Sequence, residues 1–354
     1  MRFNRRQFLL RTTAGAACAA GSANPLLADR KRSANEKSPA ELFTPEVRAA
    51  VERGLAYLAR KQITNGANRG AFGNSSYAAG VAVCGLGGLA FMCGGHAPSE
   101  GLYGQHVERC IEFVLRNTRD TGYITRGDNT VHENMYGHGF AMLFLAQAYG
   151  MTMKAEIEEK LRRAVALTCK SQNGIGGWRY QPSSSDADLS ITVCQIMALR
   201  AAHDAGITVS DTVRSKCIDY VKKSQNLQDG SFRYTINGHS TTAMTAAGVT
   251  SLYSAGIYEG EQVEKALKYL SARKPPSGSS DHYYFYTQYY AVQAMWHAGG
   301  EYWNEWYPAI RMELLQKQSA DGSWSIGVGG PELGTAMASI ILQMPLNFLP
   351  VFSP

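Results

Sequence analysis

Two aspartates near the middle of the chain have the residue type and spacing that best suit acid catalysis. Asp186 and Asp188 lie in "GGWRYQPSSSDADLSITVCQI", just before an almost uncharged segment. Two close carboxyl groups in a dry interior can share one proton, because burial raises a carboxyl pKa by about 3 to 5 units. The same residues also fit a simpler role, since aspartate is a preferred helix N-cap and suits the helix dipole. The sequence leaves both roles open.

A run of aromatic residues, "DHYYFYTQYYAVQAMWHAGGEYWNEWY", is the second candidate for a site. Tyr283, Tyr286 and Tyr290 are three and four residues apart, which places them on one face of a helix. Aromatic rings stabilise a cation by about 0.5 to 2 kcal/mol each, and they equally suit an isoprenoid or a sugar that never reacts. We expect these tyrosines, with Tyr136 and His138, to bind a ligand, while other rings of the run pack between helices.

The sequence predicts neither a metal nor a cofactor. The segment "HENMYGH" contains His132, Glu133 and His138. Residues six apart on a helix point about 240° apart, so His132 and His138 would not face one ion. The glycine runs "GLGGLA" and "GVGG" lack the preceding strand that a phosphate-binding loop requires.

The elements that must hold these residues form a repeat of 46 to 55 residues, counted six times along the chain. The best copies read "CKSQNGIGGWRY", "KKSQNLQDGSFRY" and "LQKQSADGSWSI", and each contains a glutamine, a glycine-bearing turn and an aromatic residue. A fixed period of this length indicates one supersecondary unit stacked on its neighbours. We expect the glutamines, Gln172, Gln225 and Gln318, to bond backbone groups at helix ends. The turn aromatics are expected to stack between neighbouring hairpins.

Each copy predicts a pair of helices. The segment before each turn is charged and amphipathic, with residues such as Val51, Leu55 and Leu58 recurring three and four apart. The segment after each turn is nearly uncharged and rich in small residues, which indicates burial on almost every face. Six inner and six outer helices would close into an all-α ring, because an open solenoid needs polar capping repeats. Most inner helices are expected to end at a glycine: Gly94, Gly150, Gly206, Gly256 and Gly299.

Residues 1–28 differ from the rest and fit an export signal. A basic start containing Arg5 and Arg6 precedes a segment rich in glycine and alanine. The arginine pair followed by Gln-Phe-Leu resembles the twin-arginine motif, which carries folded proteins. We therefore expect cleavage near Ala28, a periplasmic or extracellular location, and the twin-arginine export machinery as a partner.

Removal of this signal changes how the charge is interpreted. The net charge of the 354-residue chain is +6, and loss of the four signal arginines lowers it to +2. No concentrated basic stripe remains, so a nucleic-acid partner is not expected, and membrane association is not indicated. Residues 29–44 read as a polar linker and residues 45–354 as a single domain. The six remaining cysteines lie in helical segments and read mainly as small core residues.

The repeat resembles the terpenoid cyclase and protein prenyltransferase superfamily, and squalene-hopene cyclase repeats in particular. The resemblance covers nearly all of the chain after the signal and implies an (α/α)6 toroid. Class II cyclases carry Asp-x-Asp-Asp at the start of an inner helix. Asp186 and Asp188 match the first two aspartates, whereas Leu189 replaces the last. The resemblance implies that Asp188 protonates an alkene of an isoprenoid.

Three functions therefore remain open. The first is an exported terpene-cyclase-like enzyme, and the second is a binding or scaffold toroid that holds an apolar, isoprenoid-like molecule. The third is an exported polysaccharide-acting enzyme, which would use charged residues at the mouth of the ring: Arg126, Asp128, Glu133 and Arg179. A single ring with an export signal favours binding slightly over a full cyclase. The C-terminal segment after Pro345 is expected to plug or brace the ring.

Overall fold

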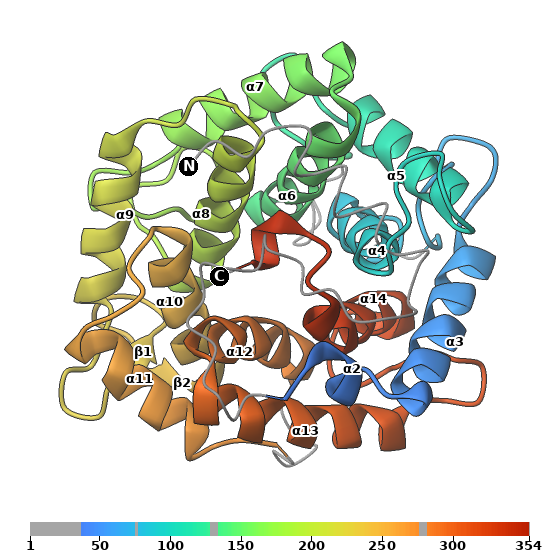
Figure 1. Cartoon of the computed structure of the whole chain (residues 1–354). Coiled ribbons are helices and arrows are strands. Elements are labelled where there is room, and N and C mark those ends of the chain that lie inside the picture. The colour runs from blue at the N-terminus through green and yellow to red at the C-terminus, as the bar shows by residue number, and fades with distance from the viewer. Residues whose placement is uncertain (1–36, 75–76, 128–133, 276–281, 354) are drawn as a thin grey trace.

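The computed structural model describes residues 37–74, 77–127, 134–275 and 282–353. Two concentric layers of helices form a closed ring, as Figure 1 shows. The outer helices are α3 (Pro45–Lys61), α5 (Gly104–Arg116), α7 (Ala155–Lys170), α9 (Asp211–Lys223), α11 (Glu261–Ser271) and α13 (Gly300–Lys317). The inner helices are α4 (Val81–Cys93), α6 (Met135–Thr152), α8 (Leu189–Asp204), α10 (Thr242–Ser254), α12 (Tyr284–Ala298) and α14 (Gly330–Gln343). The predicted all-α toroid is confirmed.

The ring closes because the last hairpin packs on the first. Each inner helix contacts the next one along the chain, and α14 contacts both α4 and α3. The remaining regular segments are short: α2 (Pro39–Leu42), β1 (Phe232–Arg233), β2 (Ser240–Thr241) and the 3-10 turns η3 (Met344–Leu346) and η4 (Pro350–Phe352). Helix α2 lies within the predicted linker, and its Leu42 is buried. The described part of that segment thus packs on the ring.

The repeat glutamines join neighbouring hairpins. The Nε2 amide of Gln172 donates to the carbonyls of Gly176 (2.9 Å) in its own turn and Val213 (2.8 Å) in the next outer helix. Gln318 repeats this pattern toward the first hairpin, donating to Gly322 (3.0 Å) and Ala50 (2.9 Å). The expected bonds to backbone groups are confirmed, but the partners lie in the turn and within the neighbouring outer helix. Gln318 therefore closes the ring with a bond across 268 residues of sequence.

Small residues on the inner helices make room for the turn aromatics. Gly87 and Gly248 have no space for a Cβ atom, because the rings of Phe72 and Phe232 lie against their Cα positions. The indole of Trp324 packs on Gly54 of the first hairpin, as expected for stacking between hairpins. Close packing of this kind explains why the inner segments are rich in glycine and alanine.

The glycines at the ends of the inner helices follow the prediction only in part. Gly206, Gly256 and Gly299 have positive φ angles of 92°, 88° and 69°, as expected for a left-handed terminus. Gly150 instead lies inside α6, where Met153 takes the left-handed position with φ 53°. The prediction was also displaced by one residue at the end of α4, because Gly94 has φ −81° and Gly95 has the positive φ.

The C-terminal segment, residues 344–353, seals one end of the ring. Figure 1 shows this segment at the centre of the ring, inside the layer of inner helices. The Phe352 ring is buried and lies 6.3 Å from the Tyr289 ring of α12. Arg200, in the last turn of α8, donates to the carbonyl of Ser353 at 3.1 Å. The segment therefore plugs the end at which the inner helices finish.

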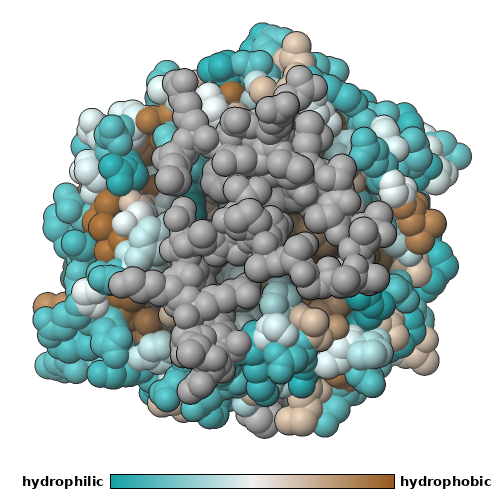
Figure 2. Space-filling model, in the orientation of Figure 1, coloured by the Kyte–Doolittle hydropathy of each residue, from teal (hydrophilic) through white to brown (hydrophobic). Residues whose placement is uncertain are grey.

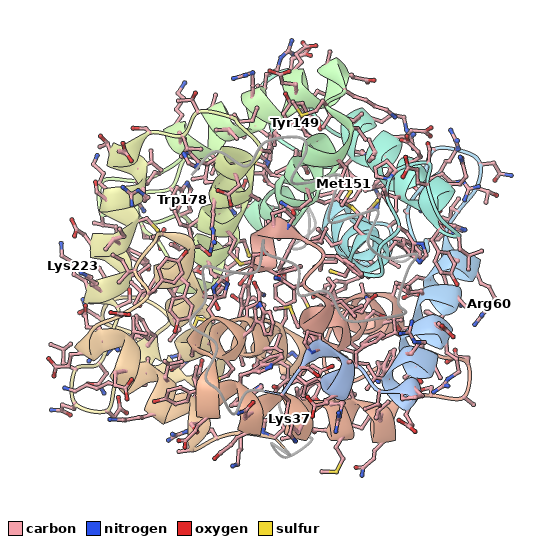
Figure 3. All side chains as sticks on the ribbon, viewed as in Figure 1. Lys37, Arg60, Tyr149, Met151, Trp178 and Lys223 are labelled. Atoms are coloured by element: carbon pink, nitrogen blue, oxygen red, sulfur yellow. The ribbon has the colours of Figure 1, made fainter. Side chains whose placement is uncertain are left out.

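The outer surface is mainly polar. Charged side chains of the outer helices, such as Arg60 and Lys223, lie at the periphery, whereas Trp178 lies inside the outer layer (Figure 3). The rim of the face in Figure 2 has mostly hydrophilic colours. Within the described ranges, no helix combines the length and apolar character needed to cross a membrane.

Candidate functional site

Asp188 lies at the end of the ring opposite the C-terminal plug. It is the N-cap of α8, whereas Arg200 beside the plug lies one turn from the other end of this helix. The 16-residue helix α8 is about 24 Å long, so the two ends of the ring are well separated. The Asp188 side chain is fully buried.

Both carboxylate oxygens of Asp188 have partners. Oδ1 accepts hydrogen bonds from the Ser190 hydroxyl (2.6 Å) and the Ile191 backbone N–H (2.8 Å). Oδ2 accepts from the Tyr234 hydroxyl (3.1 Å) and lies 3.5 Å from Nη1 of Arg179. Asp188 thus caps the helix and also enters a side-chain network that a cap alone does not require.

Opposing effects act on the ionisation of Asp188. Burial raises its pKa, because a charged carboxylate loses the stabilisation of water. The hydrogen bonds from Ser190 and Ile191, together with the Arg179 charge and the Tyr234 hydroxyl, favour the carboxylate and act in the opposite direction. Burial is the larger effect, and the pKa of Asp188 lies above its ordinary value.

Asp186 has a different environment from Asp188. Its side chain is 62% exposed, and its Oδ2 lies 3.5 Å from Nε of Arg179. Arg179 therefore contacts both carboxylates. An exposed aspartate has no desolvation to hold a shared proton, so the two acids do not form the enclosed pair that the spacing suggested.

Tyrosines from opposite sides of the ring meet on its axis. Tyr136 of α6 bonds to the Ser190 hydroxyl, and the Tyr286 hydroxyl of α12 donates to the Ser190 carbonyl at 3.0 Å. The rings of Tyr136 and Tyr286 lie 6.4 Å apart, although three steps of the ring separate α6 from α12. The Tyr290 ring follows one turn deeper, 4.8 Å from Tyr286, and its hydroxyl lies 3.2 Å from Cys194 Sγ.

Three of the sequence-predicted tyrosines thus lie together with Asp188, and one does not. Tyr283 precedes the first residue of α12, and its side chain is 57% exposed. Helical spacing does not apply at this position, because the backbone there has not yet entered the helix. Tyr283 therefore lies outside the group formed by Asp188, Ser190 and the other tyrosines.

Two further tyrosines and an arginine complete this group. All three belong to the turn sequence of the repeat. Tyr180 and Tyr234 follow the turn aromatic by two residues in "GGWRY" and "GSFRY". Their hydroxyls lie 2.5 Å apart, and both rings flank the Arg179 guanidinium at 5.1 and 5.6 Å. We call Arg179, Tyr180, Asp188, Ser190, Tyr234, Tyr136, Tyr286 and Tyr290 the tyrosine cluster.

His138 is not part of the tyrosine cluster. The Ile124 backbone N–H donates to its Nδ1 (3.1 Å), so the neutral ring carries its proton on Nε2, which faces the Thr168 hydroxyl at 2.8 Å. Burial lowers the pKa of His138 to about 3. This neutral histidine joins α6 to the neighbouring outer helix α7.

The structure does not place most of the other predicted charged residues. His132, Glu133 and Asp128 lie outside the described residues, and Arg126 is half-buried. Among the residues that the structure describes, no three His, Cys, Asp or Glu side chains are arranged to hold a metal ion.

Solved structures share this fold. No protein-family model matches the chain, and no curated protein matches it either. Cellobiose 2-epimerase from Bacillus thermoamylovorans superposes with a TM-score of 0.64 at 11% identity, over 86% of this chain and 99% of that one. An α-1,6-mannanase of Salegentibacter, solved with mannotetrose, gives 0.60 at 10% identity over 86% and 100%.

A terpene cyclase has the same architecture. The type II cyclase MstE from Scytonema, in complex with geranylgeranyl dihydroxybenzoate, gives a TM-score of 0.58 at 17% identity, over 86% of this chain and 98% of that one. These similarities confirm the α/α toroid that the resemblance to terpenoid cyclases implied. They show the fold alone, because enzymes acting on sugars and on isoprenoids match it about equally.

Proposed function

We propose that the protein binds an apolar molecule of the isoprenoid type against the tyrosine cluster. The observation that carries this proposal is the meeting of Tyr136 and Tyr286 on the axis of the ring. Both residues are half-buried, as are Tyr180 and Tyr234, so part of each residue's surface remains accessible at the Asp188 end. Accessible aromatic faces beside few polar groups are typical of small-molecule sites.

Among the described residues, Asp186 and Asp188 do not have the arrangement of a glycoside-cleaving pair of acids. Such a site needs two carboxyl groups that are free to act on either side of the substrate. Asp188 has both oxygens engaged by neighbouring groups, and Asp186 faces solvent beside Arg179. An apolar ligand needs neither acid, and the tyrosine cluster supplies the surface that it does need.

One observation supports a second function, proton-initiated isomerisation of the bound isoprenoid. The pKa of Asp188 is raised by burial, as a general acid requires. Arg179 and the donors on both oxygens stabilise the carboxylate instead, which makes the protonated form that would donate the proton harder to maintain. Binding without turnover is therefore our primary proposal.

Ligand capture tests both functions. The protein purified from its native envelope would be extracted with organic solvent, and the extract analysed by mass spectrometry. The purified protein and an Asp188→Asn variant would also be given squalene and shorter polyprenyl substrates. Asp204→Asn is the matched control, because Asp204 is a second carboxyl with a pKa raised by burial, at the far end of α8.

We expect a co-purifying isoprenoid and no new product in any of the three proteins. A cyclised product that disappears only in Asp188→Asn would instead establish the isomerase. An extract without isoprenoid, combined with no binding of the added substrates, would contradict both functions.

We also propose that the protein is exported through the twin-arginine pathway. The support is the Arg5-Arg6 pair in its basic and apolar context. Replacing both arginines with lysine keeps the charge and removes the guanidinium pair. We expect the variant to accumulate uncleaved in the cytoplasm, as judged by cell fractionation and intact mass. Unchanged export of the variant would contradict the proposal.

A further inference from the structure

Within the described part of the chain, the Arg179 side chain makes two ion pairs and no hydrogen bond. Its nearest polar atoms are carboxylate oxygens of Asp186 and Asp188, both at 3.5 Å. Its Nη1 atom is closed to solvent and has no hydrogen-bond partner. Arginine carries five N–H donors, and a buried donor without a partner is costly. Such a group in a native site calls for an explanation, and a partner supplied by water or by a ligand is one.

The neighbouring hydroxyl groups are already bonded to other groups, and the two carboxylates contact Arg179 only as ion pairs at 3.5 Å. The hydroxyls of Tyr180 and Tyr234 lie 2.5 Å from one another, and Tyr234 also donates to Asp188. The Ser190 hydroxyl is bonded to Asp188 and Tyr136. Nη1 is enclosed, but the Arg179 side chain as a whole keeps 24% of its surface exposed beside the two flanking rings. A ligand at the Asp188 end can therefore reach the exposed part of this side chain.

The charges around Arg179 restrict the kind of group that it can accept. Among the described residues, Asp186 and Asp188 are the acids that lie against it. The three side chains together carry a net charge of −1 when Asp188 is ionised and zero when it is protonated. A phosphate or diphosphate would meet repulsion or no attraction at all, because like charges at close range disfavour binding. A neutral oxygen atom can accept from the guanidinium without that repulsion.

We propose that Arg179 recognises a neutral oxygen atom, a hydroxyl or a carbonyl, on the isoprenoid ligand. This inference rests on the proposed binding function and specifies its ligand class: an oxygenated isoprenoid, neither a pure hydrocarbon nor a prenyl diphosphate. The apolar chain lies on the faces of Tyr136 and Tyr286, and the oxygen lies beside Arg179. A site built to hydrogen-bond an oxygen rejects the analogue that lacks it, because its donor is then left unpaired.

Three probes of equal chain length test the assignment on the purified full protein: geranylgeraniol, its diphosphate, and the hydrocarbon of the same skeleton. Their dissociation constants would be measured by isothermal titration calorimetry at constant salt. We expect the alcohol to bind about tenfold more tightly than the hydrocarbon, and the diphosphate more weakly than the alcohol. Arg179→Met keeps the length of the side chain and removes its donors, and it should make the alcohol and the hydrocarbon equal.

Arg214→Met is the matched control, since Arg214 also pairs with an aspartate but lies on the outer helix α9. The Arg214→Met variant should keep the tenfold difference in dissociation constant between the alcohol and the hydrocarbon. The wild-type ratios decide the question even if Arg179→Met does not fold, and Arg179→Lys provides a milder change of the same donor. Equal binding of alcohol and hydrocarbon by the wild type, or tightest binding of the diphosphate, would overturn the inference and leave the binding function intact. Failure of all three probes would overturn the binding function, and the inference with it.

Discussion

The two ends of the ring differ in how their arginines are held. At the plugged end, Arg200 donates to the Ser353 carbonyl and pairs with Asp204, and most apolar residues of the C-terminal segment are buried. At the Asp188 end, Arg179 makes only ion pairs among the described residues, and four half-buried tyrosines keep part of their surface accessible. Both ends are built from the same hairpins, so the difference comes from a few side chains.

This difference separates stability from function. The buried Phe352 ring and the hydrogen bond of Arg200 stabilise the plugged end, whereas Arg179 at the Asp188 end has an Nη1 atom without a hydrogen bond. Functional sites are the places where such local costs are expected. Four substitutions test whether the two ends differ in this way.

Loss of the plug should have the largest effect. Phe352→Ala removes a buried ring from the centre of the ring and should lower the free energy of unfolding by about 3 kcal/mol. Urea denaturation of the variant and the wild type gives this difference. Leu102→Ala is the control. Leu102 is 79% exposed, so its truncation should change the free energy of unfolding very little. Equal effects of the two would show that the C-terminal segment does not seal the ring.

Acidification should weaken the protein through His138. The pKa of His138 is about 3 in the folded state and about 6.5 in the unfolded state. Below pH 6.5 the unfolded state therefore binds a proton that the folded state does not bind. Stability should therefore fall by about 2 kcal/mol between pH 7 and pH 5. The His138→Gln variant should lack this part of the pH dependence, whereas the variant of exposed His203, His203→Gln, should retain it. A pH slope shared by all three proteins would exclude His138 as its source.

The opposite pH dependence is expected from Asp188. Its folded pKa is raised by burial, so as pH rises above the ordinary value the unfolded state gives up its proton first and is favoured. Asp188→Asn keeps a side-chain oxygen that can cap the helix but removes the charge beside Arg179. This change should lower the free energy of unfolding by about 1 to 2 kcal/mol. Urea unfolding across pH should show that the stability gap between wild type and variant narrows as pH rises. A gap that widens would mean that Arg179 outweighs burial.

The smallest effect is expected within the tyrosine cluster. Tyr286→Phe removes one hydrogen bond to the Ser190 carbonyl and should cost about 1 kcal/mol. Tyr283→Phe, at the exposed position before α12, should cost much less. Thermal unfolding followed by circular dichroism compares them. A larger loss of stability in Tyr283→Phe than in Tyr286→Phe would contradict the structural role that we assign to Tyr286.

The fold could be predicted from the sequence because each hairpin repeats the same signals. Glutamine, turn glycine, turn aromatic and an uncharged helix recur with a nearly constant spacing, and the packing of Gly87 and Gly248 on turn aromatics explains why. The ends of the helices were less predictable. Met153 takes the left-handed position after α6 without the glycine that usually marks it.

The site could be predicted only for residues that occupy similar positions along their inner helices. Asp188, Tyr136 and Tyr286 all lie near the starts of inner helices, so a closed ring brings them together. The partners of His138, in contrast, come from a turn and from an outer helix that its own spacing does not indicate. The pairing of Arg179 with Asp188 likewise depends on how the turn before α8 folds back on itself.

The bond from Gln318 to Ala50 has a consequence for how this architecture can change. An open array of repeats can gain or lose a unit by duplication or deletion, because each unit needs only its neighbours. Here each hairpin turns the chain by about one-sixth of a circle, and the last must meet the first. Loss or gain of one hairpin would therefore require every remaining interface between hairpins to change its angle before the ring could close. Insertions in the turns leave those interfaces unchanged, so the turns are where this ring can vary and still stay closed.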